Sequence, residues 1–143
     1  FLDEEDVVKK KIMSMFTDPN HLRVQDPGRV EGNPVFIYLD AFSRPEHFSE
    51  FLPEYQNLDE LKEHYQRGGL GDVKVKKFLN NVMQAELGPI RERRKMWEQR
   101  TADVFDILKA GTEVAREKAA ATLHDVRSSM RINYFEDQDF LNQ

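Results

Sequence analysis

The sequence lacks several residues and patterns that common classes of protein need. It contains no cysteine, which excludes disulfides, thiol catalysis and cysteine-bound metal centres. No apolar run approaches the ~20 residues of a membrane-spanning helix, and no signal-peptide pattern opens the chain. Its four histidines never lie three or four residues apart, so no helical pair of histidine metal ligands exists. We therefore expect a cytoplasmic protein without metal or membrane partner.

What is present indicates a folded domain with uneven charge. The chain has 143 residues, 33% of them charged and 39% hydrophobic, and a net charge of −5. This acidity argues against a general DNA-binding protein. Residues 72–100, however, hold eight lysines and arginines against four acidic residues, a local charge of +4 that leaves −9 elsewhere. Such a stretch suits a localised contact with an anion, and a solvated helix face explains it equally well.

The periodicity predicts an all-α fold, a bundle of five to seven helices with one long loop after the first. Apolar residues recur at helical spacing over residues 1–16, and no period-two run predicts a strand. Residues 17–33 carry scattered prolines and glycines and form the loop. Loops of this length inside a compact domain are uncommon and often functional. We expect one domain over residues 1–143, with the bundle over 34–133 and a frayed tail over 134–143.

Capping patterns place the other helices. The N-terminal signals are Asn33-Pro34, Ser43 with Glu46, Asn57 with Glu60, and Asp72 after the glycine stop at 68–69. The helix from Asp72 should be the longest, and Gly88-Pro89 should bend it. Thr101 should cap a short helix through Lys109, with a break at Gly111-Thr112 before the last helix.

No catalytic constellation is visible. Gly69-x-Gly71-x-x-Lys74 imitates a dinucleotide fingerprint, but lysine takes the place of the third glycine and no strand precedes it. No phosphate-binding loop, nucleophile elbow or catalytic triad occurs. We expect no catalytic residue in this chain.

Four blocks spread over nearly the whole length carry a family resemblance. They are Val7 to Ile12 with Thr17-Asp18; Gly28 to Asn33 followed by Phe36 to Phe42; Gly69-Leu70-Gly71 to Lys76 with Pro89 to Arg93; and Ile107 to Ala115. In this order they resemble the C-terminal helical, anticodon-binding region of bacterial tryptophanyl-tRNA synthetases, which are class I aminoacyl-tRNA synthetases. The third block has two extra residues before its lysine relative to the family's G-x-G-x-x-K pattern.

The resemblance implies a function shared with a second domain. In this family a catalytic domain attaches tryptophan to its tRNA with ATP and magnesium, and the helical region receives the anticodon. The catalytic motifs are absent here, so we expect that domain before residue 1 and no cofactor in this part. The implied partners are the tRNA for tryptophan and that catalytic domain. The family is homodimeric largely through the catalytic domain, so we expect a monomer or weak dimer.

The resemblance also assigns two residues. Asp18 matches the family's aspartate that hydrogen-bonds an anticodon base, and Lys76 occupies the position of its anticodon-contacting lysine. A turn-capping aspartate before Pro19 and a solvated helix lysine are the alternative roles. Five more cations are candidates for phosphate contacts that position the RNA: Lys74, Lys77, Arg91, Arg94 and Arg100.

A different class of function stays open. The acidic net charge and the lack of catalytic chemistry also fit a helical protein–protein interaction module without RNA binding. An exposed apolar face on the first helix would support it, although the same face could equally contact the catalytic domain.

Overall fold

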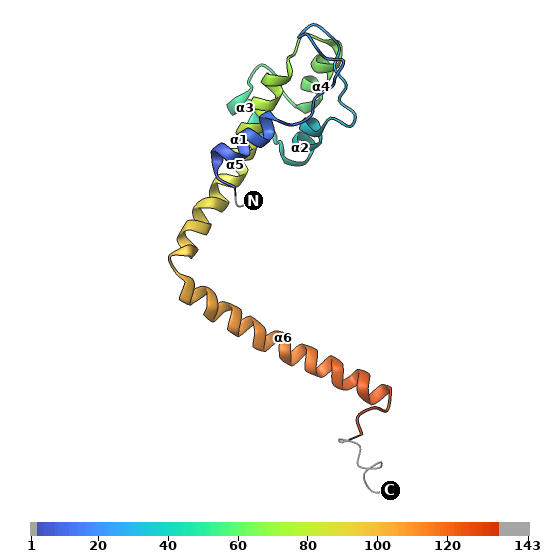
Figure 1. Cartoon of the computed structure of the whole chain (residues 1–143), viewed down its shortest axis with the longest axis vertical. Coiled ribbons are helices and arrows are strands. Elements are labelled where there is room, and N and C mark those ends of the chain that lie inside the picture. Colours follow the sequence, from blue (N-terminus) through green and yellow to red (C-terminus); the bar gives the residue numbers. More distant parts are fainter. Residues whose placement is uncertain (1–2, 135–143) are drawn as a thin grey trace. The chain divides into compact units, whose positions relative to one another are not determined.

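The computed structural model describes residues 3–134, which form six helices and no strand (Figure 1). The helices are α1 (Glu5–Met13), α2 (Pro34–Phe42), α3 (Pro45–Phe51), α4 (Leu58–Arg67), α5 (Asp72–Glu98) and α6 (Thr101–Ser129). The predicted all-α class and the long loop after the first helix are confirmed. The chain divides into two compact units, one up to Arg94 and one from Lys95 on, where the sequence predicted a single domain. The predicted tail, apart from Tyr134, lies outside the described residues.

The buried apolar core of the described residues lies entirely in the unit up to Arg94. Sixteen apolar side chains form it, and each of α1 to α5 contributes at least one. In Figure 1, α1 to α4 gather around the first part of α5. Leu39, Leu61 and Leu79 are completely buried. Because burial of apolar surface is the main favourable term in folding, this cluster accounts for the stability of the first unit.

The long loop is held in place by the C-terminal end of α4. The Gly28 N–H donates to the Tyr65 carbonyl at 2.9 Å, and the Gly69 N–H donates to the Val24 carbonyl at 2.6 Å. A Cβ at Gly28 would overlap the Tyr65 ring, and a Cβ at Gly68 would overlap the Gln25 carbonyl. The glycines therefore allow the loop backbone to lie directly on this helix end.

Two of the predicted caps, at Asn33 and Asn57, are confirmed, and those at Ser43 and Thr101 are wrong, since Arg100 occupies the capping position of α6. The Asn33 side chain accepts from the Val35 N–H, and that of Asn57 accepts from the Glu60 N–H. Ser43 does not begin α3, because it is the C-terminal cap of α2. The cap of α3 is Arg44, followed by a proline at the first helical position.

The longest sequence-predicted helix agrees with α5 at its start. It begins at Asp72, and the expected stripe from Val75 to Met83 is buried. Ile90, expected in the same stripe, is 40% exposed. The helix continues through Pro89 to Glu98, so the proline does not end it. A proline costs the helix one backbone hydrogen bond, and the bend expected at Gly88-Pro89 stays a prediction.

The prediction of a break at Gly111-Thr112 is wrong, since α6 runs without interruption from Thr101 to Ser129. A glycine inside a helix costs only about 1 kcal/mol relative to alanine, which is too little to stop a long run of good helix formers. None of the residues of α6 is buried. Over residues 3–134 the structure offers no helix with the length and apolarity that a bilayer crossing requires.

Candidate nucleic-acid interface

Asp18 lies in the loop after α1 with its carboxylate held by two backbone groups. Its Oδ1 accepts from the Asn20 N–H and its Oδ2 from the Arg29 N–H, both at 2.9 Å. The Asn20 contact is the largest of the causes that lower the pKa of this carboxyl, followed by the Arg29 contact. The side chain is half-buried. Asp18 is therefore an oriented carboxylate, and each oxygen retains a lone pair for a ligand.

A surface pocket of about 360 Å³ opens beside this carboxylate. Phe16 and Pro19 come from the same segment as Asp18, and Arg29 and Glu31 come from the far end of the loop. The Arg29 side chain is 71% exposed and its Nη2 lies 3.4 Å from Glu31. The pocket thus combines a fixed acceptor and an aromatic ring, which proteins use on unpaired RNA bases, with an exposed cation that is paired with Glu31.

Phe16 is a site residue that sequence reasoning missed. The spacing of apolar residues places it inside the helix predicted over residues 1–16, but α1 ends at Met13 and Phe16 is 64% exposed. The available signal was an aromatic residue directly before a Thr-Asp-Pro turn, where the helix had to stop.

Lys76 is buried, with only 8% of its surface exposed. Its ammonium donates to the carbonyls of Met13 at 3.1 Å and Met15 at 2.7 Å. The Met13 carbonyl belongs to the last residue of α1, where helix geometry leaves acceptors without a partner and favours a cation, and the Met15 carbonyl lies two residues beyond. Lys76 therefore fixes the segment that leads into Phe16 and Asp18, and two of its three N–H donors are used in doing so.

Lys74 belongs to a different pocket, of about 560 Å³, between the segment after α3, α4 and the start of α5. Its ammonium forms an ion pair with Glu54 at 2.5 Å and lies 5.7 Å from the centre of the Tyr55 ring. The hydrogen bond between the Lys74 ammonium and the Glu54 carboxylate raises the pKa of Lys74 and lowers that of Glu54. A phosphate contact by Lys74 would compete with this pair.

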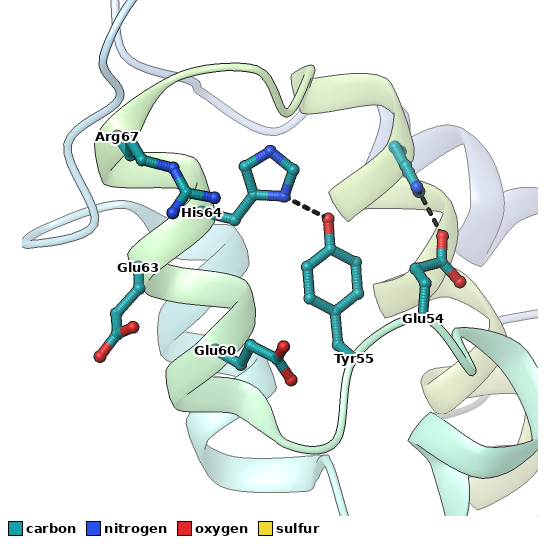
Figure 2. Close-up of a pocket in the computed structure, with 7 residues that line it drawn as sticks. Glu54, Tyr55, Glu60, Glu63, His64 and Arg67 are labelled. Atoms are coloured by element: carbon teal, nitrogen blue, oxygen red, sulfur yellow. Dashed lines mark hydrogen bonds and ion pairs between the residues drawn. The ribbon is translucent and has the colours of Figure 1, made fainter.

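Figure 2 shows the inside of the same pocket. The Tyr55 hydroxyl points to the His64 ring and lies 2.6 Å from its Nδ1. Glu60 and Glu63 line the wall together with Arg67, so acidic groups outnumber cations even with Lys74 included. This balance does not favour an RNA phosphate.

The other predicted cations lie along α5 and at the start of α6. Lys77 is exposed near the start of α5. Arg91 is half-buried, and its Nη2 donates to the Gln84 side chain at 2.5 Å. Lys77 and Arg91 are about 21 Å apart along the helix axis, at about 1.5 Å per residue. They therefore cannot bind one phosphate together.

Arg94 and Arg100 fall in different units. Arg94 is exposed in the first unit. Arg100 lies in the second unit, where its Nε donates to Asp103 at 2.6 Å and its guanidinium lies 5.1 Å from the centre of the Trp97 ring. The structure thus joins Lys76 to the segment of Asp18, whereas Lys74 and Lys77 lie near the start of α5 and Arg91 and Arg94 lie a turn apart further along it. Residues 3–134 contain no group of three side chains suited to hold a metal ion.

Comparisons with known proteins agree with the resemblance seen in the sequence. No protein-family model matches the chain. It is 56% identical over 133 residues to a tryptophan–tRNA ligase of Clostridium longisporum, which covers 93% of this chain and 36% of that protein. Tryptophan–tRNA ligases of Streptococcus mutans and Streptococcus pyogenes are 53% and 50% identical over the same share of the chain.

A solved structure supports the fold. The crystal structure of tryptophanyl-tRNA synthetase from Campylobacter jejuni superposes with a TM-score of 0.65 at 23% identity, over 90% of this chain and 38% of that one. The predicted resemblance is therefore confirmed: this chain is similar over 93% of its length to tryptophan–tRNA ligases, and it spans about 36% of the length of those relatives.

Proposed function

We propose that this chain is the C-terminal, anticodon-recognising region of a tryptophan–tRNA ligase. The observation that carries the proposal is the 56% identity to such a ligase over 93% of the chain. The share of 36% of that relative leaves room for a separate catalytic region, in which ATP and magnesium would bind. In the whole enzyme, that region would attach tryptophan to its tRNA in the cytoplasm.

Within the chain, the pocket at Asp18 is the proposed contact with the anticodon. An ionised carboxylate only accepts hydrogen bonds, so it selects base edges that donate. Its two backbone hydrogen bonds pre-orient it, which reduces the ordering cost of binding. All three bases of the tryptophan anticodon CCA carry an exocyclic amino group, so each can donate a hydrogen bond to such a carboxylate.

Lys76 is proposed to support the same site by positioning the start of the loop. Its bonds to Met13 and Met15 set the position of the loop start, and its third N–H donor is the part that a direct RNA contact would use. Lys77, Arg91 and Arg94 are proposed to contact phosphates, which would position the RNA without reading its sequence. Lys74 and Arg100 would have to exchange Glu54 and Asp103 for a phosphate.

The oligomeric state follows from the same proposal. The first unit has its own core, so it does not require a second copy to fold. We propose a monomer or weak dimer for this chain and a homodimer for the whole enzyme. A helical protein–protein interaction module is the less favoured reading, because the relatives at 50–56% identity are ligases that act on tRNA by name.

The test is a binding titration of the chain with the tRNA for tryptophan, against the same tRNA carrying an unrelated anticodon. The proposal predicts tighter binding to the native anticodon, and affinity that falls as salt rises, because phosphate contacts release counterions. Equal affinity for both tRNAs would exclude anticodon recognition. Binding only to the catalytic region, with no RNA bound, would favour the interaction module.

A further inference from the structure

We propose that Phe16 is the stacking platform for one unpaired base, whose amino-bearing edge is read by Asp18; this inference rests on the proposed function. Neither residue is supplied by a helix, since both follow the end of α1. They line the same pocket, so one ligand can reach the ring and the carboxylate together.

The exposure of Phe16 needs an explanation that the fold does not provide. Its neighbour Met15 packs against the core, whereas Phe16 is 64% exposed. A large aromatic side chain contributes most to stability when it is buried. Aromatic residues left exposed beside polar groups are typical of binding surfaces. Base stacking on aromatic rings is a sequence-tolerant contribution to the binding of single-stranded nucleic acids, beside the contacts with phosphates.

The chain holds this ring at a defined place. On one side, the Met15 carbonyl is fixed by Lys76 at 2.7 Å. On the other side, the Asp18 carboxylate is fixed by the N–H groups of Asn20 and Arg29. Phe16 therefore lies between two anchored points, which keeps its backbone in a constant relation to the carboxylate. Stacking and edge reading need such a relation in order to act on the same base.

The chemistry of the pocket also restricts the ligand. Its volume of about 360 Å³ lies at the lower end of the ~300–1,000 Å³ of small-molecule sites, which suits one base rather than a folded element. The carboxylate accepts from the amino group of cytosine or adenine. In uracil a carbonyl replaces the amino group of cytosine, and its oxygen would face the carboxylate. The Arg29 guanidinium is paired with Glu31, so a contact with the phosphate of the bound nucleotide would have to replace that ion pair.

The test uses the whole chain and a synthetic RNA stem–loop with CCA in its loop. Phe16→Leu keeps the apolar bulk and removes the aromatic face, so binding should weaken about tenfold, while Phe16→Tyr should bind as the unchanged chain does. Leu22→Ala is the matched control, because Leu22 is 86% exposed on the same loop but does not line the pocket. Thermal unfolding of all variants should be unchanged, since these side chains are exposed.

A second series identifies the base. Each base of the loop triplet is replaced in turn by uracil, and one replacement should weaken binding far more than the other two. Asp18→Asn should reduce that difference, because an amide can donate to the uracil carbonyl.

Three results would contradict the account, each at a different point. If the unchanged chain does not distinguish CCA from an unrelated triplet, the proposed function itself fails. If it does distinguish them but Phe16→Leu binds as well as Phe16→Tyr, the stacking role of Phe16 is wrong and the proposed function stands. If no uracil replacement matters more than the others, the reading of an amino edge by Asp18 is wrong.

Discussion

The two units of this chain are both helical, but they obtain their helices in different ways. In the unit up to Arg94, sixteen apolar side chains from α1 to α5 and the segments between them form a common core. In the unit from Lys95 on, α6 buries no residue, and its large apolar side chains are exposed, including Phe105 at 68% and Val114 at 69%. The first unit therefore depends on tertiary packing, whereas α6 depends on local helix propensity and side-chain pairs such as Arg116 with Glu113.

This difference also separates the two kinds of predicted site residue. Asp18 and Lys76 are fixed by contacts that the folded first unit provides. The Arg100 side chain, in contrast, contacts Trp97 and Asp103, which are both within three residues of it in the sequence. A recognition site needs groups held at constant geometry, so we place it in the unit with the core.

The different roles of packing in the two units are tested most directly by truncating one leucine in each unit. Leu79→Ala, at a completely buried position, should lower the free energy of unfolding by about 2–5 kcal/mol. Leu108→Ala, at a position that is 59% exposed on α6, should change it by at most about 0.5 kcal/mol. Urea denaturation followed by circular dichroism measures both. Equal losses would show that α6 has a core of its own.

A second pair of variants compares a buried and an exposed lysine. Lys76→Met removes the donor from two carbonyls at the end of α1 and should cost about 1–3 kcal/mol of stability. Lys109→Met, on the exposed surface of α6, should be neutral. The stability of each variant and its affinity for the CCA stem–loop are measured together. Unchanged stability with weaker RNA binding would assign Lys76 a direct contact instead of the positioning role.

Substituting one glycine in each unit by alanine should change stability in opposite directions. Gly68 has a φ of +89° and its Cβ position is occupied by the Gln25 carbonyl, so Gly68→Ala should destabilise the first unit by about 1–3 kcal/mol. Gly111 lies in a regular helix with open space around it, so Gly111→Ala should stabilise α6 by up to about 1 kcal/mol. Thermal melts of the two variants should therefore shift in opposite directions. A shift in the same direction would contradict the assignment.

The smallest expected effect is the pH dependence at Asp18. Its pKa is lowered in the folded chain by the Asn20 and Arg29 N–H groups, so the ionised form is the one that the fold favours. Its stabilising contribution is complete above the unfolded pKa, near 3.8, and is lost as the pH falls through the lower folded value. Amide NMR signals of Asn20 and Arg29 should shift together in that acidic window. In Asp18→Asn this shared transition should disappear.

Much of the fold could be predicted because local signals and tertiary packing agree in the first unit. Several helix ends depend only on local hydrogen bonding and backbone conformation, which neighbouring residues determine. These ends are marked by Asn33 with its proline, by Asn57, and by the glycines before Asp72. The prediction failed where two local signals competed. Pro45 set the cap of α3 one residue beyond Ser43, and the single glycine at 111 was too weak to interrupt α6.

The site was less accessible to sequence reasoning, because its contacts join distant residues. The resemblance pointed to Asp18, but nothing local shows that the Arg29 N–H would hold its carboxylate. Lys76 was read as a surface residue, although it stands seven positions before the buried Met83 and so shares its helix face. Phe16 was missed because its spacing continued the apolar pattern of α1 beyond the point where the helix ends.

The most direct test of the central claim is an amide NMR titration of the whole chain with the CCA stem–loop. If the pocket at Asp18 binds the anticodon, the largest shifts should fall on residues that line it, namely Phe16, Asn20, Arg29 and Gly32. Smaller shifts should follow at Lys77 and Arg91 on α5. Shifts confined to α6, or to the pocket of Tyr55 and His64, with none around Asp18, would contradict the account.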